Sequence, residues 1–231
     1  MVNMDGVDML VVNNIGFHYK QKRNKSPFLL NDINFNLEKG CILGLLGLKG
    51  AGKTTLMDLI RGKYTPKVGS ILYEGVEIDK DSWEVLQKIA YVSDEVDFLK
   101  FRTLRENAEL FGGLYEGFSF SSWNDFMFDF GFCADKLEYC YGSLRSDEKI
   151  IFQLAFALSY FPTILLLDVV SINIDQYLGT SWMSLIKQKV DSGEISVIIA
   201  MESIREVDDI LDCILELDRG NQKMFVDKNI N

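Results

Sequence analysis

Two patterns of apolar residues run along the chain. Residues 10–19 and 33–37 are predicted to be strands, and the second alternates apolar and polar positions as a half-buried strand does. Residues 164–168 and 196–200 are apolar at almost every position, which is typical of strands buried on both faces. We expect the two early strands to form an antiparallel layer laid against the core that the later strands build.

Helical segments separate the later strands. Helices are predicted at residues 56–61, 82–88, 147–160, 176–191 and 204–211. The remaining strands are predicted at residues 71–73 and 76–78, which form a hairpin, and at 89–92, 213–217 and 222–226. Because strands that alternate with helices form parallel sheets, we predict an α/β fold with a mostly parallel sheet and a ligand at the carboxyl ends of its strands.

Aromatic residues are concentrated between residues 98 and 141, where aliphatic residues are few. This composition predicts a helical subdomain over about residues 94–148, set into a single domain whose core comprises residues 1–93 and 149–231. The aromatic side chains either fill the core of that subdomain or, in addition, line a groove into which a partner helix docks.

Composition excludes several classes of function. The net charge of −10 argues against a general affinity for nucleic acid, so we expect no nucleic-acid partner. The four cysteines show no metal-binding spacing, and the single histidine, His18, excludes a histidine-rich metal site. Residues 150–167 carry no charge, but Pro162 interrupts them, so we predict a buried helix, a break and a buried strand rather than a membrane span.

A glycine-rich loop follows the apolar run 41–46 and precedes the predicted helix. Such a loop turns its backbone N–H groups towards phosphate oxygens at a helix N-terminus, so this is a Walker A phosphate loop. In this motif Lys53 reaches the β- and γ-phosphates, and the Thr54 hydroxyl ligates Mg²⁺. The loop residues that we predict to bind the nucleotide are Gly47, Leu48, Lys49, Gly50, Ala51, Gly52, Lys53, Thr54 and Thr55.

Two further residues fit a nucleotide site. Asp168 directly follows four apolar residues, which is the Walker B pattern of a carboxylate that contacts Mg²⁺. Tyr19 ends the first predicted strand beside a polar, basic segment, where a purine could stack on it or where it could simply fill apolar space.

Taken together, the motifs resemble those of the ATP-binding-cassette (ABC) ATPases over nearly the whole chain, and most of all the nucleotide-binding subunits of bacterial transporters whose membrane domain is a separate polypeptide. The residues that carry the resemblance are Tyr19, 47–55, 103–107, 155–158 with Pro162, 165–168, Asp175 and 217–220. The resemblance implies a P-loop NTPase core that binds ATP and Mg²⁺, with Tyr19 on adenine and Asp175 signalling across a head-to-tail pair of cassettes. It also implies a transmembrane permease subunit and a second ABC subunit, identical or different, as partners. The location implied is cytoplasmic, peripheral at the inner face of the cell membrane.

Four positions depart from the family pattern. Val169 stands where the catalytic glutamate is expected, and Glu202 stands where the switch histidine is expected. The signature motif is replaced by residues 144–148, in which Arg145 is the one group that could still reach a phosphate. Asp94 replaces the Q-loop glutamine and can still contact Mg²⁺. We therefore expect no catalytic residue of the family to be intact. Valine cannot act as a general base, and a general base typically contributes a factor of about 10²–10⁴ to the rate.

These departures lead to one hypothesis and two alternatives. The hypothesis is an ATP-binding subunit of a membrane transporter whose hydrolysis is weak or absent, so that ATP acts as a ligand favouring the closed dimer. The first alternative is an active transport ATPase in which a carboxylate such as Glu202 activates water. The second is a soluble regulatory cassette without a membrane partner.

Overall fold

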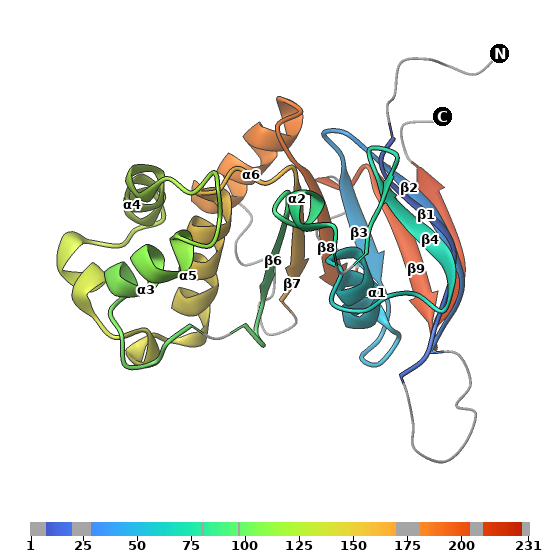
Figure 1. Cartoon of the computed structure of the whole chain (residues 1–231), viewed down its shortest axis with the longest axis horizontal. Helices are drawn as coiled ribbons and strands as arrows, with labels where there is room; N and C mark the ends of the chain where they lie inside the picture. Colours follow the sequence, from blue (N-terminus) through green and yellow to red (C-terminus); the bar gives the residue numbers. More distant parts are fainter. Residues whose placement is uncertain are drawn as a thin grey trace.

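A computed structural model describes residues 8–19, 29–79, 81–96, 98–169, 181–203 and 210–227. Within these residues the strands form one ten-stranded sheet in the order β5-β4-β1-β2-β10-β9-β3-β8-β7-β6 (Figure 1). The strands are β1 Asp8–Phe17, β2 Leu30–Glu38, β3 Ile42–Leu46, β4 Val68–Tyr73, β5 Val76–Glu77, β6 Ile89–Ser93, β7 Ile164–Asp168, β8 Ser196–Met201, β9 Cys213–Asp218 and β10 Asn221–Asp227.

The sheet has an antiparallel part and a parallel part. β1, β2, β4 and β5 pair antiparallel with one another, whereas β9, β3, β8, β7 and β6 all run parallel. β10 joins the two parts through an antiparallel ladder with β9 and one parallel pair, Asn221 with Asn31 of β2. The predicted α/β fold with an antiparallel layer is confirmed, and the layer also contains the hairpin β4–β5, which follows the glycine loop in the sequence.

Helices cover both faces of the parallel strands. They are α1 Lys53–Ile60, α2 Trp83–Leu86, α3 Leu104–Gly112, α4 Phe120–Asp129, α5 Ser146–Leu158 and α6 Ser181–Asp191. α1 lies between the parallel strands and the antiparallel layer, while α3, α4 and α5 lie on the far side, away from that layer (Figure 1). Because neighbouring strand residues point to opposite faces, Leu166 packs with α1, whereas Leu165 and Leu167 pack with α5.

The uncharged run 150–167 folds as the sequence predicts. α5 ends at Leu158, Phe161 adopts a left-handed backbone with φ of 53°, and β7 begins at Ile164. No helix among the described residues is long and apolar enough to cross a lipid bilayer.

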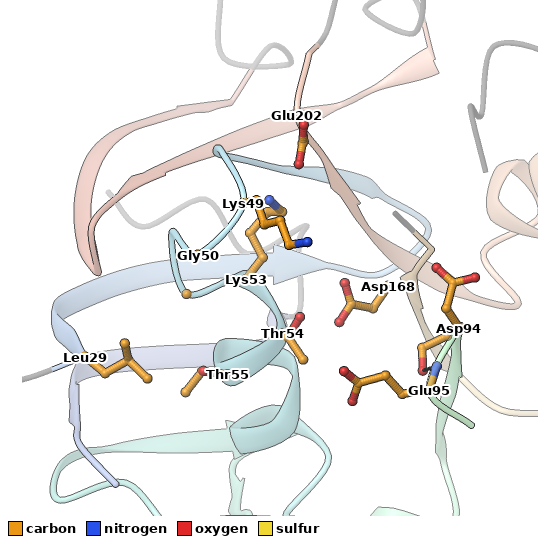
Figure 2. Close-up of a pocket in the computed structure, with 12 residues that line it drawn as sticks. Leu29, Lys49, Gly50, Lys53, Thr54, Thr55, Asp94, Glu95, Asp168 and Glu202 are labelled. Carbon is orange, nitrogen blue, oxygen red and sulfur yellow. Dashed lines mark hydrogen bonds between the residues drawn. The ribbon is translucent and has the colours of Figure 1, made fainter. Parts of the chain in front are cut away.

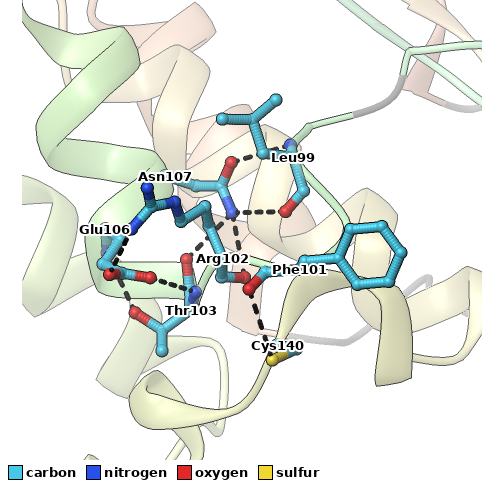
Figure 3. Close-up of polar contacts among 7 residues, drawn as sticks. All are labelled: Leu99, Phe101, Arg102, Thr103, Glu106, Asn107 and Cys140. Carbon is cyan, nitrogen blue, oxygen red and sulfur yellow. Dashed lines mark hydrogen bonds and ion pairs between the residues drawn. The ribbon is translucent and has the colours of Figure 1, made fainter.

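Asn107 organises the segment that leads into α3 (Figure 3). Its fully buried side chain accepts a hydrogen bond from the Leu99 N–H at 2.8 Å and donates to the carbonyl oxygens of Leu99, Arg102 and Thr103 at 3.1, 3.2 and 2.9 Å. Thr103 then caps the helix by accepting from the Glu106 N–H at 3.1 Å, and Glu106 accepts from the Thr103 N–H at 2.9 Å. The sharp turn before α3 is therefore fixed by side chains that pair with its backbone.

Most predicted helix positions hold, with differences at their ends. The helix expected at 82–88 is the short α2, which ends at Leu86. The first five residues of the helix predicted at 176–191 and most of the one at 204–211 lie outside the described residues, as does Asp175. The boundaries of the proposed helical subdomain stay a prediction.

Candidate nucleotide-binding site

The glycine-rich loop connects the carboxyl end of β3 to the start of α1. Its backbone is anchored at both ends, because the Gly47 N–H donates to the Met201 carbonyl at 3.1 Å and the Ala51 carbonyl accepts from the Gly220 N–H at 3.0 Å. A Cβ at Gly47 would lie 2.6 Å from the Leu217 carbonyl oxygen, so a larger residue does not fit there. Gly52 begins α1 with φ of 108°, a conformation that favours glycine.

The Lys53 side chain bonds back to the first residues of the loop. Its side chain is buried, and the ammonium group donates to the carbonyl oxygens of Gly47 and Leu48, the latter at 3.2 Å. Burial lowers the pKa of Lys53 below its ordinary value of 10.5, while the negative charges of Glu202 and Asp168 act in the opposite direction. The Lys53 amino group therefore lies at the base of the loop, on the side of the two carboxylates.

A pocket of about 380 Å³ opens beside this loop (Figure 2). It lies at the carboxyl ends of β6 and β7, the edge at which the sequence predicts a ligand. The residues that line it are Leu29, Lys49, Gly50, Gly52, Lys53, Thr54, Thr55, Ser93, Asp94, Glu95, Asp168 and Glu202. The two lysines supply positive charge on the loop side, and the acidic residues face them from the strand ends.

Asp168 supplies a buried carboxylate to the pocket. It is 5% exposed, and its Oδ2 accepts a hydrogen bond from the Tyr91 hydroxyl at 3.1 Å. Its Oδ1 is buried and has no hydrogen-bond partner among the described residues. Figure 2 shows the carboxylate turned towards the phosphate loop and Thr54. An unpaired carboxylate oxygen beside a hydroxyl is the hard oxygen donor set that suits Mg²⁺, so the residues present fit that cation.

Asp94 and Glu95 lie in the turn after β6 and both line the pocket. Figure 2 shows the Glu95 side chain reaching towards Thr54, whereas Asp94 projects to the other side. Glu95 is thus an acidic group of the pocket that the sequence did not single out. Spacing cannot reveal it, since the orientation of neighbouring turn residues depends on local backbone conformation.

Tyr19 lies next to the pocket rather than in its wall. Its hydroxyl oxygen is 3.2 Å from the hydroxyl oxygen of Thr55, which does line the pocket. The ring makes edge contacts with Phe17 and Tyr64, with centroids 5.1 and 5.4 Å away, and it remains 41% exposed. The exposed position predicted for this aromatic residue is present, and a purine on its ring stays a prediction.

Three loop residues that we predicted to bind the nucleotide do not line the pocket. Gly47 and Ala51 hold the loop to its neighbours through backbone hydrogen bonds, and Leu48 is largely exposed. The sequence motif identifies the loop as a unit, but it does not distinguish the residues that face the pocket from those that shape it.

The positions that depart from the family pattern have distinct surroundings. Val169 is 5% exposed and packs within the apolar core on the α5 side of the sheet. Glu202 lines the pocket. It directly follows Met201, whose carbonyl oxygen accepts a hydrogen bond from the Gly47 N–H at the start of the loop. Arg145 pairs with Asp147 at 3.0 Å and with Glu148 at 3.4 Å.

The N-terminus of α5 is occupied by side chains of its own. Glu148 accepts a hydrogen bond from the Arg145 N–H at 3.0 Å and forms an ion pair with Lys136. Asp147 adds a second negative charge in the first turn of this helix. An anion that approached this helix end would meet two carboxylates, and Arg145 is already engaged with them.

A second hollow of about 400 Å³ lies next to Tyr91. We call it the aromatic groove, and its lining residues are Arg61, Trp83, Leu86, Gln87, Ile89, Tyr91, Val96, Phe98, Leu114, Tyr115, Gln153, Phe156, Ala157 and Tyr160. Many aromatic residues of the 98–141 stretch instead pack in the core, among them Trp123 and Tyr141. Some aromatic residues of that stretch thus fill the core, and others line a groove, as the two interpretations propose. What docks in the groove stays a proposal.

Comparison with known proteins gives the family. The family model described as "ABC transporter" matches residues 30–169, which is more than half of the chain. The chain therefore belongs to the ABC transporter family, as the phosphate loop and the strand-end aspartate indicate.

Individual relatives are distant in sequence. The chain is 28% identical over 180 residues to the ABC transporter ATP-binding protein YtrB of Bacillus subtilis (strain 168), covering 78% of this chain and 60% of YtrB. It is 28% identical over 221 residues to the linearmycin resistance ATP-binding protein LnrL of the same organism, covering 92% of this chain and 67% of LnrL. The chain thus spans 60% to 67% of the length of these curated relatives.

The fold also matches solved cassette structures. The dimeric structure of the ATP-binding cassette MJ0796 in a post-hydrolysis state, bound to ADP and Pi, superposes with a TM-score of 0.81 at 20% identity. The match covers 95% of this chain and 99% of that one. At this identity the similarity establishes the shared fold, a P-loop NTPase core with added helices.

Proposed function

We propose that this chain is the ATP-binding subunit of an ABC membrane transporter and that it hydrolyses ATP weakly or not at all. One observation carries the second part of the proposal. The residue that follows Asp168 is Val169, whose apolar side chain is buried in the core. A valine in that place cannot accept a proton from water. The rate of hydrolysis therefore falls by a factor of about 10²–10⁴ unless another group acts as the base.

The pocket has the groups needed to hold Mg·ATP. Lys53, Lys49 and the N–H groups of the loop suit the phosphates, and the exposed ring of Tyr19 suits the adenine. Thr54 and Asp168 would hold the Mg²⁺ ion, which neutralises phosphate charge when bound. Asp94 projects away from Thr54, so its side chain would have to turn to join them. Once bound, the nucleotide would act as a ligand that favours one conformation of the assembly.

We propose two protein partners, a transmembrane permease subunit and a second ABC subunit. The aromatic groove suits an apolar helix of a permease, because aromatic and aliphatic side chains line most of it. The cassette MJ0796 is a dimer, which supports pairing of this chain with an identical or different cassette. Binding to a permease would place the chain in the cytoplasm at the inner face of the cell membrane.

A second candidate function is an active transport ATPase. Glu202 lines the pocket close enough to Lys53 for its charge to act on the lysine pKa, so a carboxylate is present on the side of the missing histidine. If Glu202 activates water, the chain alone turns over ATP, and Glu202→Gln abolishes that turnover. If our proposal is correct, Glu202→Gln leaves turnover at background.

The proposal is tested by measuring binding and turnover side by side. Equilibrium dialysis with radiolabelled ATP gives the affinity of the purified chain, and phosphate release gives its turnover. We expect saturable binding that Lys53→Ala abolishes and that Lys67→Ala, at an exposed lysine outside the pocket, leaves unchanged. Rapid phosphate release that depends on Lys53 would contradict weak hydrolysis, and no binding by the unaltered chain would contradict the whole proposal.

A further inference from the structure

A hydrogen bond joins the nucleotide pocket to the aromatic groove. The Tyr91 hydroxyl on β6 donates to Oδ2 of Asp168 on β7, with 3.1 Å between the oxygen atoms. The two residues meet because β6 and β7 pair in parallel with Ser93 opposite Asp168, and Tyr91 shares the face of Ser93 two residues earlier. The tyrosine therefore occupies one carboxylate oxygen, while Oδ1 has no partner among the described residues.

The ring of Tyr91 belongs to the groove. It lines the groove together with Arg61, whose guanidinium carbon lies 4.2 Å from the ring centroid. Arg61 caps the end of α1, the helix that begins at Lys53, and its Nε is held by Asp58 at 2.8 Å. Tyr91 thus touches the helix of the phosphate loop through its ring and Asp168 through its hydroxyl.

The geometry makes the Tyr91 hydroxyl the donor of this bond, because a carboxylate oxygen can only accept. A donor that holds a metal-binding carboxylate fixes the orientation of that carboxylate.

We propose that Tyr91 is a positioning residue for Asp168 and that it transmits the state of the groove to the cation side of the nucleotide pocket. This inference rests on the proposed binding of Mg·ATP. A segment seated in the groove would contact Arg61 and Tyr91, whereas Asp168 is not part of the groove wall. Its influence on Asp168 would therefore pass through the ring and hydroxyl of Tyr91.

The test compares two tyrosine variants that each lose one hydrogen-bonded hydroxyl. Tyr91→Phe removes the bond to Asp168, and the matched control Tyr73→Phe removes a bond to the Thr163 hydroxyl, 2.8 Å long and outside the pocket. A fluorescent ATP analogue is titrated at increasing Mg²⁺ and in EDTA. We expect Tyr91→Phe to raise the Mg²⁺ concentration at half-saturation about 10–100-fold, as loss of an outer-shell partner does, with metal-free affinity unchanged. Tyr73→Phe should behave as the unaltered chain.

An unchanged Mg²⁺ requirement in Tyr91→Phe would overturn the positioning role. Failure of the unaltered chain to bind the analogue would instead contradict the proposed function, so the two failures are distinct. The link to the groove is tested by Arg61→Lys, which keeps the charge beside Asp58 but removes the planar group from the ring. We expect Arg61→Lys to raise the Mg²⁺ requirement when Tyr91 is present. We expect no further rise when Arg61→Lys is combined with Tyr91→Phe. Equal effects in both backgrounds, or none in either, would overturn the link.

Discussion

The hydroxyl oxygens of Tyr19 and Thr55 lie 3.2 Å apart, so the segment just after β1 is tied to the first turn of α1. This contact spans 36 residues of sequence and joins the antiparallel layer to the helix of the phosphate loop. It holds the Tyr19 ring beside the pocket, with edge contacts from Phe17 and Tyr64. The ring is therefore held in place without a ligand, which would lower the entropic cost if a base stacks on it as we propose.

Tyr19→Ala should weaken ATP binding without changing the fold. Stacking of a base on an aromatic side chain contributes about 1–3 kcal/mol, so we expect affinity to fall by a factor of about 5–150. Tyr19→Phe is the matched control, because it keeps the ring and loses only the contact with Thr55. Isothermal titration calorimetry measures both. Equal losses in the two variants would show that the hydroxyl, and not the ring, matters.

Asn107→Ala should destabilise the chain strongly. The change leaves the Leu99 N–H and the carbonyl oxygens of Leu99, Arg102 and Thr103 without their side-chain partner in a buried place. The three carbonyl oxygens keep backbone donors, the N–H groups of Arg102, Tyr141 and Asn107, so the Leu99 N–H is the one of the four that is left unpaired. An unsatisfied buried group costs about 1–3 kcal/mol, so we expect the free energy of unfolding to fall by about that amount in urea denaturation. Asn36→Ala, at an exposed asparagine of β2, is the control and should change stability little. A loss below 1 kcal/mol, on the order of a single exposed contact, would contradict this account.

The sequence was sufficient where one short segment determines the structure. The phosphate loop is an example, because its glycines, Lys53 and Thr54 are consecutive and the flanking apolar runs predict β3 and α1. Asp168 was likewise predicted, since an acid after a buried strand lies at the sheet edge where ligands bind.

Features that depend on distant pairing were not predictable. The bond from Tyr91 to Asp168 joins residues 77 apart and requires the register between β6 and β7, which no local pattern specifies. The orientation of Glu95 depends on a turn, and the self-capping of α5 includes an ion pair from Lys136, outside the helix. In each case the chemistry was visible in the sequence, but the tertiary partner was not.

The ion pair of Glu148 with Lys136 should make stability depend on pH. Burial alone would raise the pKa of the Glu148 carboxyl, but the hydrogen bonds from Lys136 and the Arg145 N–H hold it below its ordinary value of 4.5. A carboxyl whose pKa is lower when folded stabilises the fold above its unfolded pKa and loses that contribution as pH falls through the folded pKa. Glu148→Gln should therefore flatten the decline in melting temperature below pH 4.5, the ordinary value for this group.

The control for this effect is Glu84→Gln, at an exposed glutamate in α2. It should leave the acid decline unchanged. A Glu148→Gln profile that matches the unaltered chain at every pH would show that the ion pair contributes nothing to stability.

If Val169 stands in the place of a catalytic base, as we propose, Val169→Glu should raise the rate of phosphate release. A general base typically contributes about 10²–10⁴ in rate, and we expect a gain within or below that range because Glu202 still replaces the histidine. Val169 is buried, so both Val169→Glu and the matched Val169→Gln should lower the melting temperature. Only the glutamate variant should gain phosphate release. No gain from the glutamate would favour the alternative in which Glu202 already activates water.

The most direct test is to determine whether the nucleotide that stays bound to the chain after hours of incubation is ATP or ADP. The purified chain is incubated with Mg·ATP, freed of unbound nucleotide and denatured in acid, and the released nucleotide is identified by ion-exchange chromatography. We predict intact ATP at close to one molecule per chain, because in our proposal the pocket holds the triphosphate and Val169 stands where a base would activate water. Bound ADP, or a chain that retains no nucleotide, would contradict the account.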